Sequence, residues 1–297
     1  MSRWSVLFVE RAYAKINLTL DVLGKRNDGY HDVDMVMQTV DLSDLIWLEE
    51  APGTDIVIDA NVLQIPLDDR NHAVAAAKAF QRYSGLRRGL RMRLEKHIPV
   101  AAGLGGGSAD AAAVLRGLNR LWNTGYALEE LAEIGASIGS DVPFCVFGGT
   151  GLARGRGEVL TPIQHRTRYW TVLIRPAVFV STADIYGALM PVAYSTAPHS
   201  AAMTAALQTG DFDDVRSSVF NGLTETTMRL YPEVESMWSR VQTVAKAPVF
   251  MSGSGPTLYC LTPSAAAGQR VYNAWRGFCK EVYLCQWITP EWPDQRG

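Results

Sequence analysis

A glycine-rich turn constrains this chain more than any other stretch. Four of the five residues from Gly103 to Gly107 are glycine, whereas the whole chain has 26 glycines in 297 residues. Glycine lets backbone N–H groups turn inward and approach a ligand closely, and a helix that starts directly afterwards presents its positive end there. We therefore interpret GLGGGS as a phosphate-binding loop and expect Gly106 to need a positive φ. A plain strand-to-helix turn is the alternative.

Two common glycine loops do not fit this stretch. A Walker A loop needs a GK[ST] sequence, and no lysine follows Gly107. The dinucleotide fingerprint needs glycine at the position of Ser108. The loop therefore predicts phosphate binding, but neither a P-loop ATPase nor a dehydrogenase.

Hydrophobic periodicity gives the elements around the loop. Apolar and polar residues alternate over residues 10–22, which predicts a half-buried strand with Lys15 and Asn17 on one face. Further strands are predicted at residues 33–40, 45–49, 55–59 and 89–96, and helices at residues 71–85 and 128–138. A helix after the loop has Ser108 as its predicted N-cap and Asp110 in its first turn.

The second half mixes helices and strands in the same way. Residues 150–165 are rich in glycine and polar residues and are predicted to be a loop, so we place the domain boundary there. The predicted domains are residues 1–158 and 159–297. Strands are predicted at 169–175 and 281–286 and on either side of residues 252–257, a loop at 194–200, and helices at 201–209, 233–245 and 265–277. The pattern favours an α+β fold with two domains.

Composition excludes several classes of protein. Hydrophobic residues make up 47% of the chain and charged residues 20%, and the formal net charge is −2. This balance gives no general attraction to nucleic acid or to anionic lipid, so an anionic ligand must be held by a local site. We expect no membrane span, no secretion signal and a cytoplasmic protein. The four cysteines are far apart, which predicts reduced thiols and no structural zinc site.

Each candidate site residue also has an ordinary structural interpretation. Lys15 could be a solvated lysine, Asp110 a partner of the helix dipole, and Asp141 a cap or turn residue before Pro143. Tyr30 and His31 could be an exposed loop pair. The GSGP sequence at residues 253–256 could be a hairpin turn.

Taken together, these segments resemble one family. AKINL at 14–18, PVAAGLGGGSADAA at 99–112 and SGSGPT at 252–257 resemble the three motifs of the GHMP small-molecule kinases, in order. GYH at 29–31, GSDVPF at 139–144 and GRGE at 155–158 are similar to the branch of that family that acts on a cytidyl diphosphate substrate in the non-mevalonate isoprenoid pathway.

The resemblance implies a fold, a reaction and a set of site residues. The fold is the two-domain α+β GHMP kinase fold with the active site in the cleft between the domains. The reaction is ATP-dependent phosphorylation of the 2-hydroxyl of a small cytidyl diphosphate substrate, with Mg²⁺ carried as the ATP complex. Asp141 matches the catalytic base and Lys15 the catalytic lysine. Substrate contacts are implied for Asn17, Tyr30, His31, Thr182 and Tyr186. The ATP loop comprises Pro99, Val100, Ala101, Ala102, Gly103, Leu104, Gly105, Gly106, Gly107, Ser108 and Ala109.

Some features depart from the family pattern or leave alternatives open. Asp110 puts a negative charge near the phosphate end, where it could hold magnesium or act on the helix dipole, and we favour the second. Arg154 stands where many relatives have a small hydroxyl residue. No protein ligand to a metal is identified, and the oligomeric state is left open. The alternatives are a homoserine- or mevalonate-type kinase, which has no reason to carry GYH, and an inactive nucleotide-binding relative, against which Lys15 and Asp141 argue.

Overall fold

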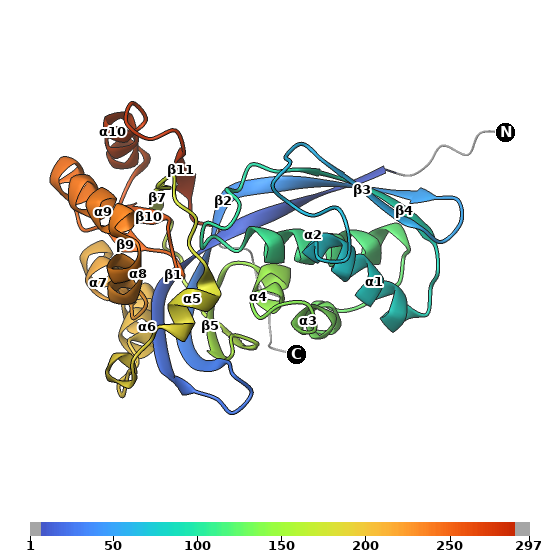
Figure 1. Cartoon of the computed structure of the whole chain (residues 1–297), viewed down its shortest axis with the longest axis horizontal. Coiled ribbons are helices and arrows are strands. Elements are labelled where there is room, and N and C mark those ends of the chain that lie inside the picture. Colours follow the sequence, from blue (N-terminus) through green and yellow to red (C-terminus); the bar gives the residue numbers. More distant parts are fainter. Residues whose placement is uncertain (1–6, 289–297) are drawn as a thin grey trace. The chain divides into compact units, whose positions relative to one another are not determined.

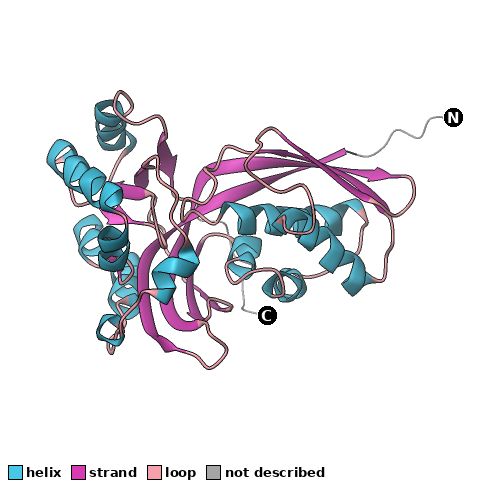
Figure 2. Cartoon of the chain, viewed as in Figure 1, coloured by secondary structure: helices cyan, strands magenta, loops and turns pink. Residues whose placement is uncertain are grey.

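The computed structural model describes residues 7–288, and the chain divides into two compact units that interleave along the sequence. The first unit comprises residues 7–14, 42–100 and 105–147, and the second comprises residues 15–41, 101–104 and 148–288. Strands β1 (Leu7–Lys25) and β2 (His31–Ala51) contribute to both units. No single cut separates the units, and the predicted boundary between residues 158 and 159 stays a prediction. Helices and strands are mixed throughout, as the sequence predicts for an α+β protein (Figure 2).

In the first unit, helices pack on one face of a group of strands (Figure 1). The strands are β3 (Ile56–Ala60), β4 (Gly89–Glu95) and the second half of β2, and the helices are α1 (His72–Ser84), α2 (Gly106–Leu121), α3 (Leu128–Ala136) and α4 (Val142–Phe147). β4 pairs antiparallel with β2 and parallel with β3. Leu90, Met92 and Leu94 are fully buried, so the alternation in β4 points its apolar side chains into the core. A side chain at Gly117 of α2 would overlap Leu48 of β2, so this glycine allows the close packing of helix on strand.

Two helix ends in this unit test the capping predictions. The Asn71 side chain accepts a hydrogen bond of 2.9 Å from Ala73 N and caps the start of α1, which was not predicted from the sequence. Gly85 ends that helix at φ +70°, as the predicted range 71–85 implies. The prediction of Ser108 as the N-cap of α2 is wrong. That helix begins at Gly106 because Gly105, at φ +68°, already turns the chain into it. Asp110 consequently lies beyond the first turn.

The second unit contains two groups of strands with helices. In the first group, β2 pairs antiparallel with β5 (Thr150–Gly155), β5 with β6 (Val159–Pro162), and β1 pairs parallel with β8 (Phe220–Asn221). The second group has the order β11 (Val282–Gln286), β7 (Trp170–Ile174), β10 (Leu258–Thr262), β9 (Phe250–Met251). The helices are α5 (Thr182–Gly187), η1 (Pro191–Ala193), α6 (Ser200–Thr209), α7 (Phe212–Ser217), α8 (Thr224–Leu230), α9 (Pro232–Ala245) and α10 (Ala265–Trp275).

The structure differs from the sequence prediction in three strand regions and in several short elements. The predicted strand at residues 10–22 is β1, but residues 14–22 are buried on both faces, so the prediction of a half-buried strand is wrong there. β2 is one long strand where two were predicted, at residues 33–40 and 45–49. The polar Asp44 does not interrupt it, because its carboxylate accepts hydrogen bonds from the backbone amides of His97 and Ile98. The predicted loop at residues 150–165 contains the β5–β6 hairpin. Its glycines suggested a loop, but β5 pairs with β2 from Val33 to Gln38. The short elements α4, α5, η1, α7, β8 and α8 were not predicted, since segments of this length carry little periodicity.

Two further expectations concern the cysteines and the membrane. Cys260 and Cys285 are buried, and Cys145 and Cys279 are half-buried. Among residues 7–288, no helix is both long and apolar enough to cross a membrane.

Candidate active site

The glycine loop ends in the first unit at the start of α2. Its N-cap is Gly105, which has no side chain to cap the first amides of the helix. A Cβ at Gly106 would lie 3.1 Å from Ile98 Cγ2, and one at Gly107 would lie 3.3 Å from His72 Nδ1. Gly103 and Gly105 have positive φ, whereas Gly106 does not, so the expectation of a positive φ at Gly106 is wrong. Glycine is favoured at Gly106 by close packing instead.

Asp141 also lies in the first unit, close along the chain to a turn that faces the loop. It stands directly before α4, and its carbonyl oxygen accepts a hydrogen bond of 3.1 Å from Cys145 N. A Cβ at Gly139, two residues earlier, would lie 3.8 Å from Ser108 Oγ and 3.7 Å from His72 Cε1. The fold therefore brings the turn at Gly139 close to Ser108 in the first turn of α2, and Asp141 is at the same time a turn residue.

A buried ion cluster lies beneath the loop. Lys96 Nζ is 2.5 Å from Asp44 Oδ2 and 2.5 Å from Asp110 Oδ2, and all three residues are buried. A Cβ at Gly106 would lie 3.6 Å from Lys96 Nζ, so the cluster sits directly under the first turn of α2. Asp110 is thus a buried hydrogen-bond partner of Lys96 and not simply a partner of the helix dipole. Burial raises the pKa of Asp110 to about 8, although the Lys96 ammonium acts in the opposite direction.

Lys15 and Asn17 lie in the second unit and are both buried. Lys15 Nζ donates a hydrogen bond of 2.8 Å to Asn17 Oδ1, and Asn17 Nδ2 lies 3.3 Å from Met35 Sδ. The backbone of Asn17 is fixed as well, because its carbonyl accepts a hydrogen bond of 2.7 Å from Tyr259. The interpretation of Lys15 as a solvated lysine is therefore wrong. A buried ammonium needs polar partners, which makes this strand segment a polar site within a core.

The three sequence motifs meet in the second unit. Lys15 N donates to the carbonyl of Leu104 at 3.0 Å, and Ser252 Oγ donates to the carbonyl of Gly103 at 2.9 Å. Gly103 has φ +74°, and a Cβ there would overlap the Ser252 carbonyl oxygen. Residues 252–257 do form the turn between β9 and β10, with Ser252 N bonded to Thr257 O at 3.0 Å. This turn therefore acts both as a hairpin and as a support for the glycine loop.

The residues assigned to the cytidyl group also lie in the second unit. His31 begins β2 and is buried, and its ring lies 5.2 Å from the ring of Tyr186 and 6.0 Å from that of Tyr194. Burial, and to a lesser extent Lys25, lowers the pKa of His31, so its imidazole is neutral at neutral pH and can both donate and accept a hydrogen bond. Tyr30 is 55% exposed. The interpretation of the two residues as an exposed loop pair therefore holds for Tyr30 and is wrong for His31.

Thr182 links this region to the third motif. Its hydroxyl lies 2.8 Å from Ser254 Oγ, and it is the first residue of α5, which also carries Tyr186. The structure therefore brings Tyr186 to His31 and Thr182 to the SGSGPT turn.

Sequence reasoning missed several residues of these sites. Lys96 and Asp44 were overlooked, although a signal was present: each continues the buried, alternate positions of its strand, after Leu94 and before Ile46 respectively. Polar residues that occupy the buried, alternate positions of two neighbouring strands predict a buried pair. Tyr194 was missed because it lies in a predicted loop, and no local pattern assigns its ring to His31.

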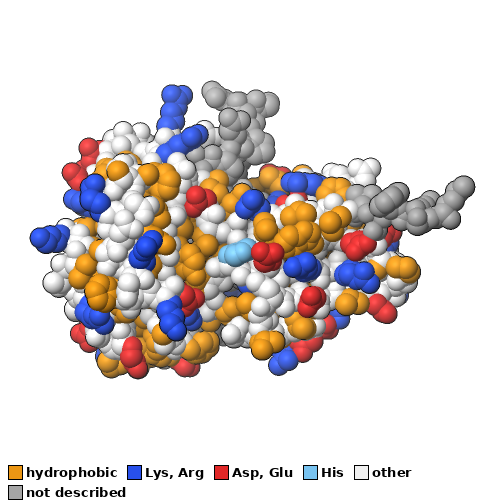
Figure 3. All heavy atoms as spheres, turned by 90° about the horizontal axis from the view of Figure 1, so that it is seen from above, with side chains coloured by type: hydrophobic (Ala, Val, Ile, Leu, Met, Phe, Trp, Pro, Cys, Tyr) orange, Lys and Arg blue, Asp and Glu red, His pale blue; other side chains and the backbone are white. Residues whose placement is uncertain are grey.

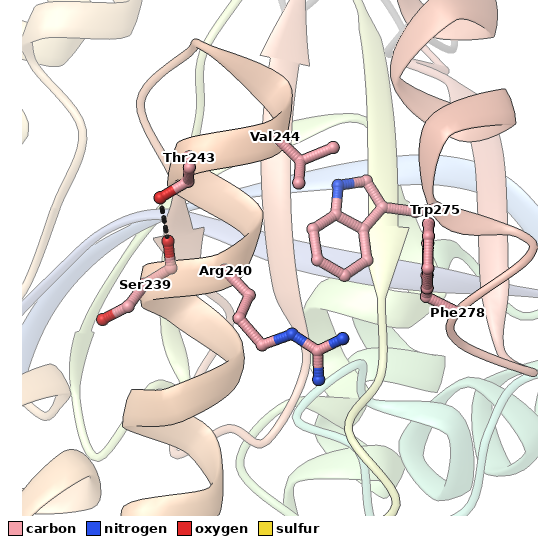
Figure 4. Close-up of a pocket in the computed structure, with 6 residues that line it drawn as sticks. All are labelled: Ser239, Arg240, Thr243, Val244, Trp275 and Phe278. Atoms are coloured by element: carbon pink, nitrogen blue, oxygen red, sulfur yellow. Dashed lines mark hydrogen bonds between the residues drawn. The ribbon is translucent and has the colours of Figure 1, made fainter.

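A further pocket in the second unit contains none of the predicted site residues. It has a volume of about 340 Å³ and is lined by Ser239, Arg240, Thr243, Val244, Trp275 and Phe278 (Figure 4). The face of the molecule in Figure 3 shows basic and acidic side chains interspersed, with no broad basic field over the part of the chain that the figure describes. Among residues 7–288, no group of three or more His, Cys, Asp or Glu side chains could hold a metal ion.

Comparison with known proteins assigns the family. The GHMP kinases N terminal domain matches residues 71–149, and the GHMP kinases C terminal domain matches residues 203–281. The chain is 48% identical over 276 residues to the 4-diphosphocytidyl-2-C-methyl-D-erythritol kinase of Exiguobacterium sibiricum, which covers 93% of this chain and 96% of that relative. It is 48% identical over 275 residues to the kinase of the same name from Geobacillus thermodenitrificans, covering 92% of this chain and 94% of that relative.

Solved structures agree with this assignment. A crystal structure of 4-(cytidine 5'-diphospho)-2C-methyl-D-erythritol kinase superposes with a TM-score of 0.81 at 30% identity, covering 95% of this chain and 100% of that chain. The homoserine kinase from Cytophaga hutchinsonii shares the fold, with a TM-score of 0.74 at 18% identity, covering 98% and 96%. The chain therefore belongs to the GHMP kinase family, and it is similar over nearly its whole length to 4-diphosphocytidyl-2-C-methyl-D-erythritol kinases. It is an ATP-using phosphotransferase with the GHMP kinase fold.

The ion cluster under the loop gives a prediction about stability. Lys96→Met removes the cation that the buried Asp44 carboxylate and the Asp110 carboxyl group share, and should lower the free energy of unfolding by about 3–5 kcal/mol. Asp110→Asn keeps the Lys96–Asp44 pair and should cost about 1 kcal/mol. Denaturant titration of the two variants and the wild type measures both changes. Equal losses for the two variants would contradict a cluster organised by Lys96.

The stability difference between Asp110→Asn and the wild type should depend on pH. The folded protein holds a proton on Asp110 up to about pH 8, whereas an unfolded aspartate releases it near 3.8. The folded state therefore binds more protons in this window, and the contribution of Asp110 to stability falls as pH rises through it. Relative to the wild type, Asp110→Asn should be more stable at about pH 9 than at about pH 5. A difference that does not vary with pH would show that Asp110 is ionised throughout.

Proposed function

We propose that this kinase transfers the γ-phosphoryl group of ATP to the 2-hydroxyl of 4-diphosphocytidyl-2-C-methyl-D-erythritol, in the non-mevalonate route to isoprenoid precursors. One observation carries the proposal: Lys15, the glycine loop and the SGSGPT turn, far apart in sequence, are joined by the Lys15–Leu104 and Ser252–Gly103 hydrogen bonds. The names of the relatives at 46–48% identity support the choice of substrate.

We propose that residues 99–109 hold the triphosphate of ATP. The fit rests on the backbone: positive φ at Gly103 and Gly105 turns the loop, and the first amides of α2 have no side-chain cap to compete with an anion. Bulkier residues would not be accommodated at Gly106 or Gly107 without displacing Ile98 or His72. Mg²⁺ would accompany ATP and offset the charge of the phosphoryl oxygens.

We propose Asp141 as the general base that accepts the proton of the substrate hydroxyl, and Lys15 as the cation that offsets negative charge at the transferring group. Phosphoryl transfer depends mainly on positioning and on charge stabilisation, and these are the roles that the resemblance gives to the two side chains. The location of Asp141 beside the turn that faces Ser108, and the buried setting of Lys15, support these roles.

We propose that the cytidyl group binds at Tyr30, His31 and Tyr186, with Asn17 and Thr182 as further polar contacts. Tyr30 exposes an aromatic face on which a pyrimidine can stack. The neutral His31 imidazole can meet the donors and acceptors of the cytosine edge. The enzyme would work in the cytoplasm on this small molecule and not on nucleic acid, in line with the net charge of −2.

A substrate panel tests the proposed function. With ATP and Mg²⁺, the wild type should phosphorylate the cytidyl compound at its 2-hydroxyl, which phosphorus NMR of the product can locate. It should use 2-C-methylerythritol 4-phosphate, homoserine and mevalonate very poorly, because a site built around hydrogen bonds to a base rejects a substrate that lacks it.

His31→Ala should raise the KM for the cytidyl compound much more than the KM for ATP. His97→Ala, which removes a histidine from the first unit, is the matched control and should leave both KM values unchanged. Equal turnover of the uncytidylated phosphate and the cytidyl compound would overturn the proposed substrate.

A second prediction concerns the base. Asp141→Asn keeps the shape of the side chain but removes the proton acceptor, so kcat should fall by about 10² to 10⁴ while the affinity for ATP stays nearly constant. Asp213→Asn, at a side chain that is 77% exposed, is the control and should behave as the wild type. Stopped-flow turnover and calorimetric ATP binding measure the two quantities. A kcat near the wild-type value in Asp141→Asn would remove this residue from the mechanism.

A further inference from the structure

We propose that Arg156 is a positioning residue that holds the Tyr30 ring in place for the pyrimidine of the substrate. The guanidinium carbon of Arg156 lies 5.0 Å from the centre of the Tyr30 ring, over its face. This inference rests on the proposed function, because it takes Tyr30 to be the platform for the cytidyl group. It adds a residue and a physical role that the proposed function does not contain.

The backbone of Tyr30 is fixed, but its side chain is not enclosed. Tyr30 N donates a hydrogen bond of 3.1 Å to Asp28 Oδ1, and Tyr30 O accepts one of 2.8 Å from Arg26 N. Arg26 in turn bonds the carboxylate of Asp32 at 2.7 Å and so ties the two ends of the turn together. The residue is nevertheless 55% exposed. An exposed tyrosine samples several rotamers and must lose that freedom when a base stacks on it.

Arg156 is itself held by its own hairpin. Its backbone N–H donates a hydrogen bond of 2.6 Å to Glu158 Oε2, and its Nε lies 3.8 Å from Glu158 Oε1. Gly157 N donates to the Arg154 carbonyl at 3.0 Å, which closes the turn between β5 and β6. The side chain therefore extends from an ordered turn, and its position over Tyr30 is not that of a freely moving surface arginine.

Charge around Tyr30 favours the guanidinium at this place. Desolvation alone would raise the pKa of Asp28, but the Tyr30 amide, Arg26 and Arg156 together outweigh it and lower that pKa. Asp28 thus attracts Arg156 toward the 26–30 turn. The interaction of the cation with the negative face of the aromatic ring acts in the same direction.

This arrangement leaves one face of Tyr30 for a ligand. With the guanidinium over one face, a pyrimidine can stack only on the opposite face. Arg156 then acts in two ways: it restricts the ring before the ligand arrives, and it sets which face is offered. Arg154, two residues earlier in β5, does not share this role, because its Nε is bound to Asp34 Oδ2 at 2.9 Å.

The test measures the KM for the cytidyl compound, the KM for ATP and kcat in Arg156→Leu, Arg156→Lys, Tyr30→Leu and the double variant. Arg166→Leu, which removes an exposed arginine of the same unit, is the control. Arg156→Leu should raise the KM for the cytidyl compound about three- to tenfold, the range that one immobilised side chain contributes to affinity, without changing kcat or the KM for ATP. Arg156→Lys should be intermediate. In the Tyr30→Leu background, Arg156→Leu should have no further effect, since the ring that it positions is absent.

Calorimetry with cytidine and with CDP separates positioning from direct contact with phosphate. Arg156→Leu should weaken the two ligands by the same factor, because both stack the same base. A loss confined to CDP, an additive effect in the double variant, or an unchanged KM in Arg156→Leu would each overturn the proposal. If the wild type fails to phosphorylate the cytidyl compound while cytidine binding still depends on Arg156 through Tyr30, the proposed function fails and the inference stands.

Discussion

The close approach of the glycine loop to its two supports is the constraint on which the proposed nucleotide site depends. Gly103 turns at φ +74° against the Ser252 carbonyl, and the hydrogen bonds from Ser252 Oγ and Lys15 N hold the loop from two sides. The loop then enters α2 through Gly105. Backbone amides bind an anion well only when their directions are fixed in advance, and these contacts fix them. The same hydrogen bond that places the loop also places the backbone of Lys15.

Much of the fold could be predicted from the sequence, and the errors have physical causes. Periodicity gave β4, α1, α9 and α10 nearly to their ends, because each is amphipathic over several repeats. It also located β1, but that strand is three residues longer at each end than predicted, and its residues 14–22 are buried on both faces. β2 and β5 were misjudged where polar residues or glycines interrupt the pattern, since their continuity depends on partners elsewhere in the chain, such as the His97 amide at Asp44. The prediction of Ser108 as N-cap failed because Gly105, with positive φ directly before Gly106, starts the helix three residues earlier.

The candidate site also has a part that the sequence predicts and a part that it does not. The glycine loop, Lys15 and Asp141 could be named from motifs, but what surrounds them could not. That Lys15 is buried against Asn17, or that His31 meets Tyr186 across the second unit, depends on tertiary contacts that no local pattern carries. The Lys96–Asp44 pair is the instructive case, because both residues continue the buried phase of paired strands and could have been predicted together. Arg156 is the opposite case, since only the structure places it over Tyr30.

Calorimetric ATP binding to Gly103→Ala and Gly106→Ala tests most directly whether the supported loop is the nucleotide cradle. Gly103→Ala forces a side chain into a left-handed backbone and against the Ser252 carbonyl, so the loop must leave its support. Gly106→Ala has an ordinary φ and must displace only the Ile98 methyl group at 3.1 Å. The account predicts that Gly103→Ala, still folded by circular dichroism, binds ATP at least about tenfold more weakly than Gly106→Ala, a difference of about 1.4 kcal/mol. Wild-type affinity for ATP in a folded Gly103→Ala variant would contradict it.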